Sequence, residues 1–332
     1  MKKAWTMAAA ALLGATVSTA AWTQDAESEA AQAPAVAVKP MPAEIMPLTP
    51  QSLLLGVVNT GDHLIAVGDR GAIIASNNGK DWAQVDVPVR SALTTVAFAD
   101  SKHGWAAGHD AAIVHTDDGG KTWKLQNFQP EIEKPVLELL ALDAQHCFAV
   151  GAYGLLLETQ DCGQTWNSVD SHGFDEDELH LNSIGKLNNG DLMIAGEQGL
   201  IAISTDGGVT WTKQASPYEG SYFGVLPHGD KGALIYGLRG NVYVSDDARS
   251  GKWTKLETGT VASMFGGAAT AGGEVLVGLN GVIVVITADD QVKLLRSPDG
   301  TPLSDVVPYG DNFFLAVGES GVQPISVKAL SH

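Results

Sequence analysis

Apolar residues recur along this chain in short runs that are separated by glycine-containing turns. Runs such as residues 155–157 and 282–285 are typical of buried β-strands. Glycine follows most of the stronger runs, and glycine readily adopts the positive φ angles that tight hairpin turns require. The pattern therefore predicts an all-β chain built from antiparallel hairpins.

One hairpin motif repeats seven times. Each copy reads apolar–apolar–Gly–x–x–Gly or a close variant, and successive copies begin 40, 43, 45, 41, 41 and 40 residues apart. This period is typical of one four-stranded blade per repeat, so the sequence predicts a seven-bladed β-propeller. The copies occupy residues 66–71, 106–111, 149–154, 194–199, 235–240, 276–281 and 316–321.

The last repeat is one strand short. Its three predicted strands cover residues 305–309, 313–317 and 322–327, close to the end of the chain. Residues 45–48 precede the first strand of the first repeat, and we expect them to supply the missing outer strand of the last blade. Such closure would hide the edges of both blades.

A second turn follows the third strand in five repeats, and its full form reads Ser/Thr–x–Asp–x–Gly–x–Thr–Trp. The Asp side chain can accept backbone N–H groups and close the turn. The Trp ring can then be buried against a neighbouring element. We interpret this turn as a stabilising element of the fold and not as a metal or catalytic site; its residues are Asn78, Trp82, Asp118, Trp123, Asp161, Trp166, Asp206, Trp211 and Trp253.

The residues between the hairpin glycines differ from repeat to repeat. Because the repeats are related by rotation, these tips should emerge on one face of the ring. Their mixture of aromatic, cationic and anionic groups suits recognition of a protein surface, although each could also be a solvated turn. Our hypothesis is a surface for a membrane-associated protein, anchored by Tyr153 and Arg239; the set is Asp69, Arg70, His109, Asp110, Tyr153, Glu197, Gln198, Arg239, Asn280 and Glu319.

The N-terminus predicts export. Lys2 and Lys3 precede an apolar stretch at 7–17 and small residues at 18–20, which is the pattern of a secretory signal peptide. We assign 1–21 to this signal, with an uncleaved anchor as the alternative. Residues 22–43 are rich in Ala, Pro, Glu and Gln and are predicted to be a flexible linker. The propeller would then occupy 44–332 in the periplasm or outside the cell.

The charge narrows the range of partners. A formal net charge of −18 disfavours nucleic acid and anionic lipid, because both require clustered Lys and Arg. No glycine-rich phosphate loop lies in a strand–loop–helix context. We therefore expect no cofactor, and a propeller that is monomeric by itself.

Two local features leave alternatives open. Cys147 and Cys162 are predicted at the same end of one blade, where they could form a disulfide or remain two buried thiols. Residues 172–180 contain two His and four carboxylates. Their spacing matches no defined zinc or EF-hand site, so we interpret them as a solvated acidic insertion and assign no metal.

Taken together, the Asp-box turns, the blade period, the hairpin motif and the signal peptide resemble the photosystem II stability and assembly factor-like group of BNR-repeat propellers. The resemblance covers about residues 44–332. It implies a non-enzymatic scaffold or assembly factor for a membrane complex, and some bacterial relatives look associated with export systems of the resistance-nodulation-division type. Photosynthetic members use an arginine-rich patch, whereas the arginines of this chain are Arg70, Arg90, Arg239, Arg249 and Arg296.

The alternative function is a glycoside hydrolase, because Asp boxes also occur in sialidases. A sialidase-like site needs three Arg converging on the substrate carboxylate, together with a Tyr–Glu pair and an Asp. Other glycosidases need two carboxylates facing each other across a cleft. No arginine of this chain lies in a recognisable sialidase context, so we favour the non-enzymatic interpretation.

Overall fold

The computed structural model describes residues 38–170, 178–310 and 313–327. The chain divides into the units Met1–Val38 and Lys39–His332, and the propeller belongs to the second. The predicted signal peptide lies outside the described residues. The second unit includes the end of the predicted linker, where the Ala43 N–H donates to Val87 O at 3.0 Å.

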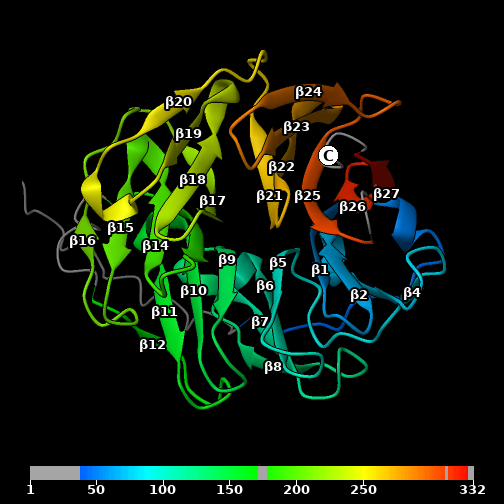
Figure 1. Cartoon of the computed structure of the whole chain (residues 1–332). Helices are drawn as coiled ribbons and strands as arrows, with labels where there is room; N and C mark the ends of the chain where they lie inside the picture. The colour runs from blue at the N-terminus through cyan, green and yellow to red at the C-terminus, as the bar shows by residue number, and fades with distance from the viewer. Residues whose placement is uncertain (1–37, 171–177, 311–312, 328–332) are drawn as a thin grey trace, which may run out of the picture. The chain divides into compact units, whose positions relative to one another are not determined.

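Seven antiparallel sheets form a β-propeller (Figure 1), as predicted. In each blade the chain passes from a first strand near the axis towards the outer edge. The first four blades consist of β1 (Leu54–Asn59), β2 (Leu64–Gly68), β3 (Ile73–Ser76) and β4 (Ala83–Gln84); β5 (Leu93–Phe98), β6 (Gly104–Gly108), β7 (Ile113–Thr116) and β8 (Lys124–Asn127); β9 (Val136–Ala141), β10 (Cys147–Gly151), β11 (Leu156–Thr159) and β12 (Asn167–Ser168); and β13 (Leu181–Lys186), β14 (Leu192–Gly196), β15 (Ile201–Ser204) and β16 (Thr212–Lys213).

The remaining three blades continue the same order. They consist of β17 (Tyr222–His228), β18 (Gly232–Gly237), β19 (Val242–Ser245) and β20 (Thr254–Leu256); β21 (Met264–Thr270), β22 (Gly273–Gly278), β23 (Val282–Thr287) and β24 (Val292–Arg296); and β25 (Leu303–Pro308), β26 (Phe313–Gly318) and β27 (Gly321–Ser326). The only helices among the described residues are nine single turns of 3-10 helix.

The core is divided into seven apolar clusters, one at each interface between neighbouring blades. A single sheet cannot bury its own faces, so each blade is stabilised by the blades beside it. The Trp of each Asp-box turn packs towards the preceding blade. Trp211, for example, meets Phe148 of the third blade edge to face, with 6.5 Å between ring centroids.

The ring closes between the first and last blades, because β1 packs directly against β25. The Val57 N–H donates to Asp305 Oδ2 at 2.9 Å, and Asn59 Nδ2 donates to Pro308 O at 3.0 Å. Sidechain–backbone bonds therefore join the two ends of the propeller domain.

The prediction that residues 45–48 form the outer strand of the last blade is wrong. Within the described residues that sheet has three strands. The Met46 N–H instead donates to Gln84 Oε1 in β4 at 2.9 Å, and η1 (Thr49–Gln51) packs against β27. Pro47 and Pro50 lack an N–H and cannot extend a sheet ladder. The exposed Pro324 lies in β27 itself, and prolines on edge strands limit pairing with further strands.

Candidate functional site

The predicted hairpin tips are structurally equivalent in all seven blades. In each, the residue after the first motif glycine donates its N–H to the carbonyl that precedes the blade's first strand, as from Asp69 to Leu53 O and from Glu319 to Pro302 O, both at 3.2 Å. The tips therefore share one end of the blades, which we call the tip face. Six of them are 3-10 turns: η2 (Asp69–Gly71), η3 (His109–Ala111), η5 (Ala152–Gly154), η6 (Glu197–Gly199), η7 (Leu238–Gly240) and η9 (Leu279–Gly281).

The middle residue of each of these six turns adopts a left-handed backbone conformation. None is glycine, although a left-handed angle costs other residues about 1 kcal/mol. Strain that is retained in every copy supports a role for the displayed side chains. The φ angles are 55° for Arg70, 61° for Asp110, 54° for Tyr153, 52° for Gln198, 58° for Arg239 and 58° for Asn280.

Most predicted tip residues are spread around the ring and do not form one cluster. Asp69 and Arg70 form an exposed ion pair with each other at 3.6 Å. The Asp110 carboxylate accepts a hydrogen bond from Ser91 Oγ. His109, Gln198 and Glu319 are exposed.

Tyr153 and Glu197 meet around His180, which itself lines the axial cavity described below. The rings of Tyr153 and His180 lie 4.8 Å apart edge to face. The His180 N–H donates to Glu197 Oε2 at 3.3 Å, and Lys134 Nζ donates to Tyr153 O at 2.8 Å. The structure thus places one predicted anchor at the rim of a cavity.

Arg239, the other predicted anchor, lines a hollow of 510 Å³ together with Lys255 and Arg296. All three side chains are exposed, and Arg296 Nη1 donates to Asn280 O at 3.0 Å. Glu257 lies at the same hollow, and Val261 is an exposed apolar residue beside it. Sequence reasoning missed Lys255 and Arg296 because they lie on β20 and β24, the outer strands of two different blades.

The arginines concentrate on the tip face. Arg70 and Arg90 line a second, smaller hollow there, where Arg90 pairs with Glu44 at 2.6 Å. Only Arg249 lies at the opposite end, where it pairs with Asp191 at 2.6 Å. Each of these two hollows brings two arginines together, whereas a sialidase-like site would require three.

An axial cavity of 610 Å³ is enclosed by the first strands of the seven blades. Every first strand carries a β-bulge one residue after its start, and bulges redirect side chains. The residues after the bulge occupy equivalent positions around the axis: Gly56, Thr95, Glu138, Ser183, Gly224, Gly266 and Asp305.

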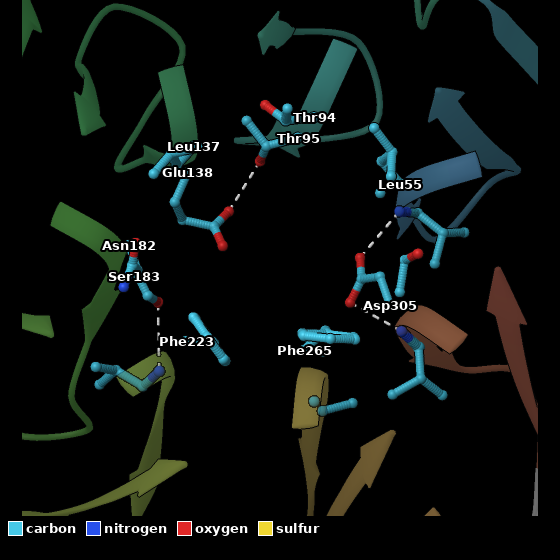
Figure 2. A pocket seen from close by; sticks show the side chains of 18 of the residues that line it. Leu55, Thr94, Thr95, Leu137, Glu138, Asn182, Ser183, Phe223, Phe265 and Asp305 are labelled. Carbon is cyan, nitrogen blue, oxygen red and sulfur yellow. Dashed lines mark hydrogen bonds between the residues drawn. The ribbon is translucent and has the colours of Figure 1, made fainter. Parts of the chain in front are cut away.

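Glu138 and Asp305 are the two carboxylates of this ring, and Figure 2 shows them projecting from separate walls towards one open space. Glu138 Oε1 accepts from Thr95 Oγ1 at 2.8 Å, whereas Asp305 accepts the N–H groups of Val57 and Val306 at 2.9 and 2.8 Å. Burial outweighs these hydrogen bonds and raises the pKa of each carboxyl to about 7.

Sequence reasoning did not identify these two carboxylates. A signal was available, because each acid interrupts an apolar first strand 13 residues before the first glycine of its hairpin motif. The equivalent position holds glycine or a hydroxyl in the other five repeats, 12 residues before that glycine in the first and sixth repeats and 13 in the rest. An aligned comparison of the seven copies would therefore have singled them out.

The Asp and Asn side chains of four Asp-box turns form hydrogen bonds within their own turns. Asp206 Oδ1 and Oδ2 accept from the N–H and Oγ1 of Thr210 at 2.9 and 2.6 Å, and Trp211 Nε1 donates to Gly208 O at 3.0 Å. Asp118 and Asp161 make the same contacts with Thr122 and Thr165. Asn78 replaces the carboxylate in the first blade and accepts from the N–H groups of residues 80 and 81.

The structure describes some of the remaining candidates from the sequence in full and others only in part. Cys147 and Cys162 are free thiols, Cys147 buried and Cys162 half-buried. Residues 172–177 of the acidic insertion lie outside the described residues, and no cluster suited to a metal ion occurs in the described part of the chain. None of the described helices is long and apolar enough to span a membrane.

These features define the class as a seven-bladed BNR-type propeller. The chain belongs to the family described as "Photosynthesis system II assembly factor YCF48", whose model matches residues 74–136 and 126–279, more than half of the chain. Two solved structures share the fold. "YCF48 bound to D1 peptide" aligns over 89% of this chain and 99% of its own, with a TM-score of 0.67 and 17% identity. "YCF48 from Cyanidioschyzon merolae" aligns over 86% and 98%, with a TM-score of 0.67 and 16% identity.

Curated relatives match over shorter stretches. The photosystem II stability/assembly factor HCF136 of Guillardia theta is 43% identical over 53 residues, or 15% of this chain and 13% of the relative. The HCF136 protein of Cyanidioschyzon merolae is 32% identical over 83 residues, or 23% and 19%. The matched stretches thus span less than a fifth of either relative.

Proposed function

We propose that this protein is a non-enzymatic assembly factor that binds an extended segment of a membrane protein outside the cytoplasmic membrane. The family assignment supports the assembly role. The main support for this binding surface is a hollow on the tip face, which is lined by Arg239, Lys255 and Arg296. These cations gather there although the chain has a formal net charge of −18.

The chemistry of this hollow favours a carboxylate ligand. Arginine forms paired hydrogen bonds with carboxylates, and clustered cations on an acidic protein attract an acidic segment or a chain terminus selectively. Val261 offers apolar contact beside the cations. The structure "YCF48 bound to D1 peptide", which shares this fold, agrees with a peptide segment as ligand. A photosystem subunit is the client that the family suggests, whereas the relatives named above give no support to an export complex of the resistance-nodulation-division type.

The test is crosslinking in native envelopes followed by mass spectrometry. We expect the wild type to capture a membrane protein and the folded Tyr153→Ala/Arg239→Ala double variant to lose it. Lys121→Ala, an exposed cation at an Asp-box turn, is the matched control and should retain capture. Equal capture by the double variant would show that the tip face is not the binding surface.

The glycosidase alternative has its own assay. Purified protein should leave fluorogenic glycosides uncleaved, including a sialoside, from pH 4 to 8. Turnover that survives purification and disappears in Glu138→Gln or Asp305→Asn would replace the assembly proposal with a hydrolase.

A further inference from the structure

At Asp305 the axial cavity holds a carboxyl group where the fold requires only a hydrogen-bond acceptor. Asp305 accepts the Val57 N–H across the boundary to the next blade. Ser183 occupies the equivalent position in the fourth blade, where its hydroxyl accepts the Val225 N–H in the same way at 3.3 Å. A neutral oxygen therefore suffices for the structural contact, and the carboxyl group of Asp305 remains to be explained.

The cavity contains no basic counterpart for these acids except a histidine. Its titratable lining residues are Glu138, His180, Tyr236 and Asp305, and no Lys or Arg lines it among the described residues. Ionised carboxylates without a partner are costly to enclose in protein. A positively charged group entering the cavity would supply the missing partner.

The buried Tyr236 provides an independent indication of a ligand. Its side chain is 4% exposed, and its hydroxyl reaches the cavity wall beside Gly224 and Gly267. No residue of the described ranges forms a hydrogen bond with this hydroxyl. Buried polar groups normally have partners, so an unpartnered hydroxyl facing a cavity points to a hydrogen-bonding occupant.

The rest of the lining combines hydroxyl and amide groups, such as those of Thr95 and Asn182, with apolar side chains. Phe223 and Phe265 lie with ring centroids 5.7 Å apart on adjacent blades, and both line the cavity (Figure 2). Val57 and Val306 add aliphatic surface. Aromatic faces attract cations as well as hydrocarbon, so the lining suits a group with an apolar stem and a positive end.

We propose that the axial cavity binds a primary alkylammonium group, with Glu138 and Asp305 as counter-charges and the Tyr236 hydroxyl as a hydrogen-bond partner. The group is either a free alkylamine or the lysine side chain of a bound segment. This inference does not depend on the function of the tip face. Because both carboxyls must ionise to pair with the cation, binding releases protons and strengthens as pH rises.

The experiment is isothermal titration with n-pentylamine at pH 6, 7 and 8, repeated in buffers of different ionisation enthalpy to count released protons. We expect saturable binding that strengthens about tenfold between pH 6 and 8 for each carboxyl that ionises. The second ligand to be titrated is N-acetyl-lysine-N-methylamide. If it binds, the cavity admits the lysine side chain of a peptide. If only pentylamine binds, the site is assigned to free amines. Pentanol, which has the same chain without the charge, should not bind.

The matched variants are Glu138→Gln and Asp305→Asn, with the exposed Glu219→Gln as control. Each cavity variant should weaken amine binding at least about tenfold and flatten its pH dependence, whereas Glu219→Gln should behave as wild type. If Asp305→Asn does not fold, the amine affinity of Glu138→Gln and the number of protons released on binding still test the proposal. No saturation by about 10 mM amine at pH 8, equal binding of pentanol, or competition by Ca²⁺ at equimolar concentration would overturn the proposal.

Discussion

The two ends of the blades use left-handed backbone positions in opposite ways. At the Asp-box end, Gly119 and Gly207 occupy them, with φ angles of 78° and 77°. At the tip end, six blades use a residue with a side chain at comparable angles, among them Tyr153 and Arg239. Glycine adopts these angles without strain, whereas six tip turns keep a strained residue that has a side chain.

The side chains at the two ends also differ in what they contact. Asp206 directs both carboxylate oxygens to its own turn, and the same contacts recur at Asp118. The tips vary in chemistry from blade to blade around an unchanged backbone bond to the preceding carbonyl. Repeated side-chain chemistry thus marks what the fold needs, and varied chemistry on a strained backbone marks what recognition can use.

The two ends should differ most in how much a substitution lowers the free energy of unfolding, and removal of a buried Trp should show this. Trp211 is 5% exposed in the interface between the third and fourth blades. Trp211→Ala should destabilise the protein by about 3–5 kcal/mol, whereas Glu197→Ala at a tip should cost less than about 1 kcal/mol. Urea unfolding monitored by circular dichroism measures both, and equal losses would refute the assignment of the Asp-box end to stability.

Acid should weaken the Asp-box end selectively. Hydrogen bonds from the Thr210 hydroxyl and N–H, and from Ser204, lower the pKa of Asp206 to about 2 from an ordinary value of 3.8. A lowered folded-state pKa stabilises the protein above the unfolded pKa, and this contribution is lost as pH falls from about 4 towards 2. The urea midpoint of Asp206→Asn should therefore lie below that of wild type at pH 6 and approach it near pH 2.

Asp69→Asn at a tip is the matched control for this pH series. Asp69 Oδ1 accepts only the neighbouring Arg70 N–H, in an exposed turn. We expect its urea midpoint to follow wild type at every pH. A constant offset between Asp206→Asn and wild type from pH 6 to 2 would mean that ionisation of Asp206 does not contribute.

The sequence predicted the repeat but not the contacts between repeats. The hairpin motif fixed the number of blades and the position of the tips, because both follow from local turn chemistry. Residues 45–48 were misassigned because their contact with Gln84 depends on how the ends of the ring meet. Glu138 and Asp305 come together through strands far apart in sequence, and Arg239 meets Arg296 in the same way. Local periodicity contains no information about such pairs.

Glycine substitutions at the tips should separate strain from recognition. Gln198 is exposed at a φ of 52°, so Gln198→Gly should be more stable than Gln198→Ala by about 1 kcal/mol. Arg239→Gly should likewise be at least as stable as Arg239→Ala, while both variants lose partner capture. Thermal unfolding together with the crosslinking assay measures the two properties. An Ala variant as stable as its Gly counterpart would contradict retained strain at the tips.

The smallest expected effect concerns the Asp-box turn of the third blade, which has a left-handed cysteine where two other blades have glycine. Cys162 stands where Gly119 and Gly207 stand in other blades, at a φ of 61°. Cys162→Gly should therefore stabilise the protein by about 0.5–1 kcal/mol, and Cys162→Ala should not, because alanine keeps the strain. Urea unfolding under reducing conditions measures this gain without any contribution from a disulfide.

Alkylation of the oxidised, native protein then tests the thiol itself. Cys147 is buried, and burial raises the pKa of its thiol, so it should react only after unfolding. Native wild type should take up one alkyl group and Cys162→Gly none, by intact mass. If neither thiol reacts before reduction, even after unfolding, then Cys147 and Cys162 are bonded in the oxidised protein, and the left-handed angle at Cys162 serves a disulfide. A single alkylation together with the stability gain would instead show that this turn tolerates a strained residue, as the tip turns do, without the benefit of a displayed side chain.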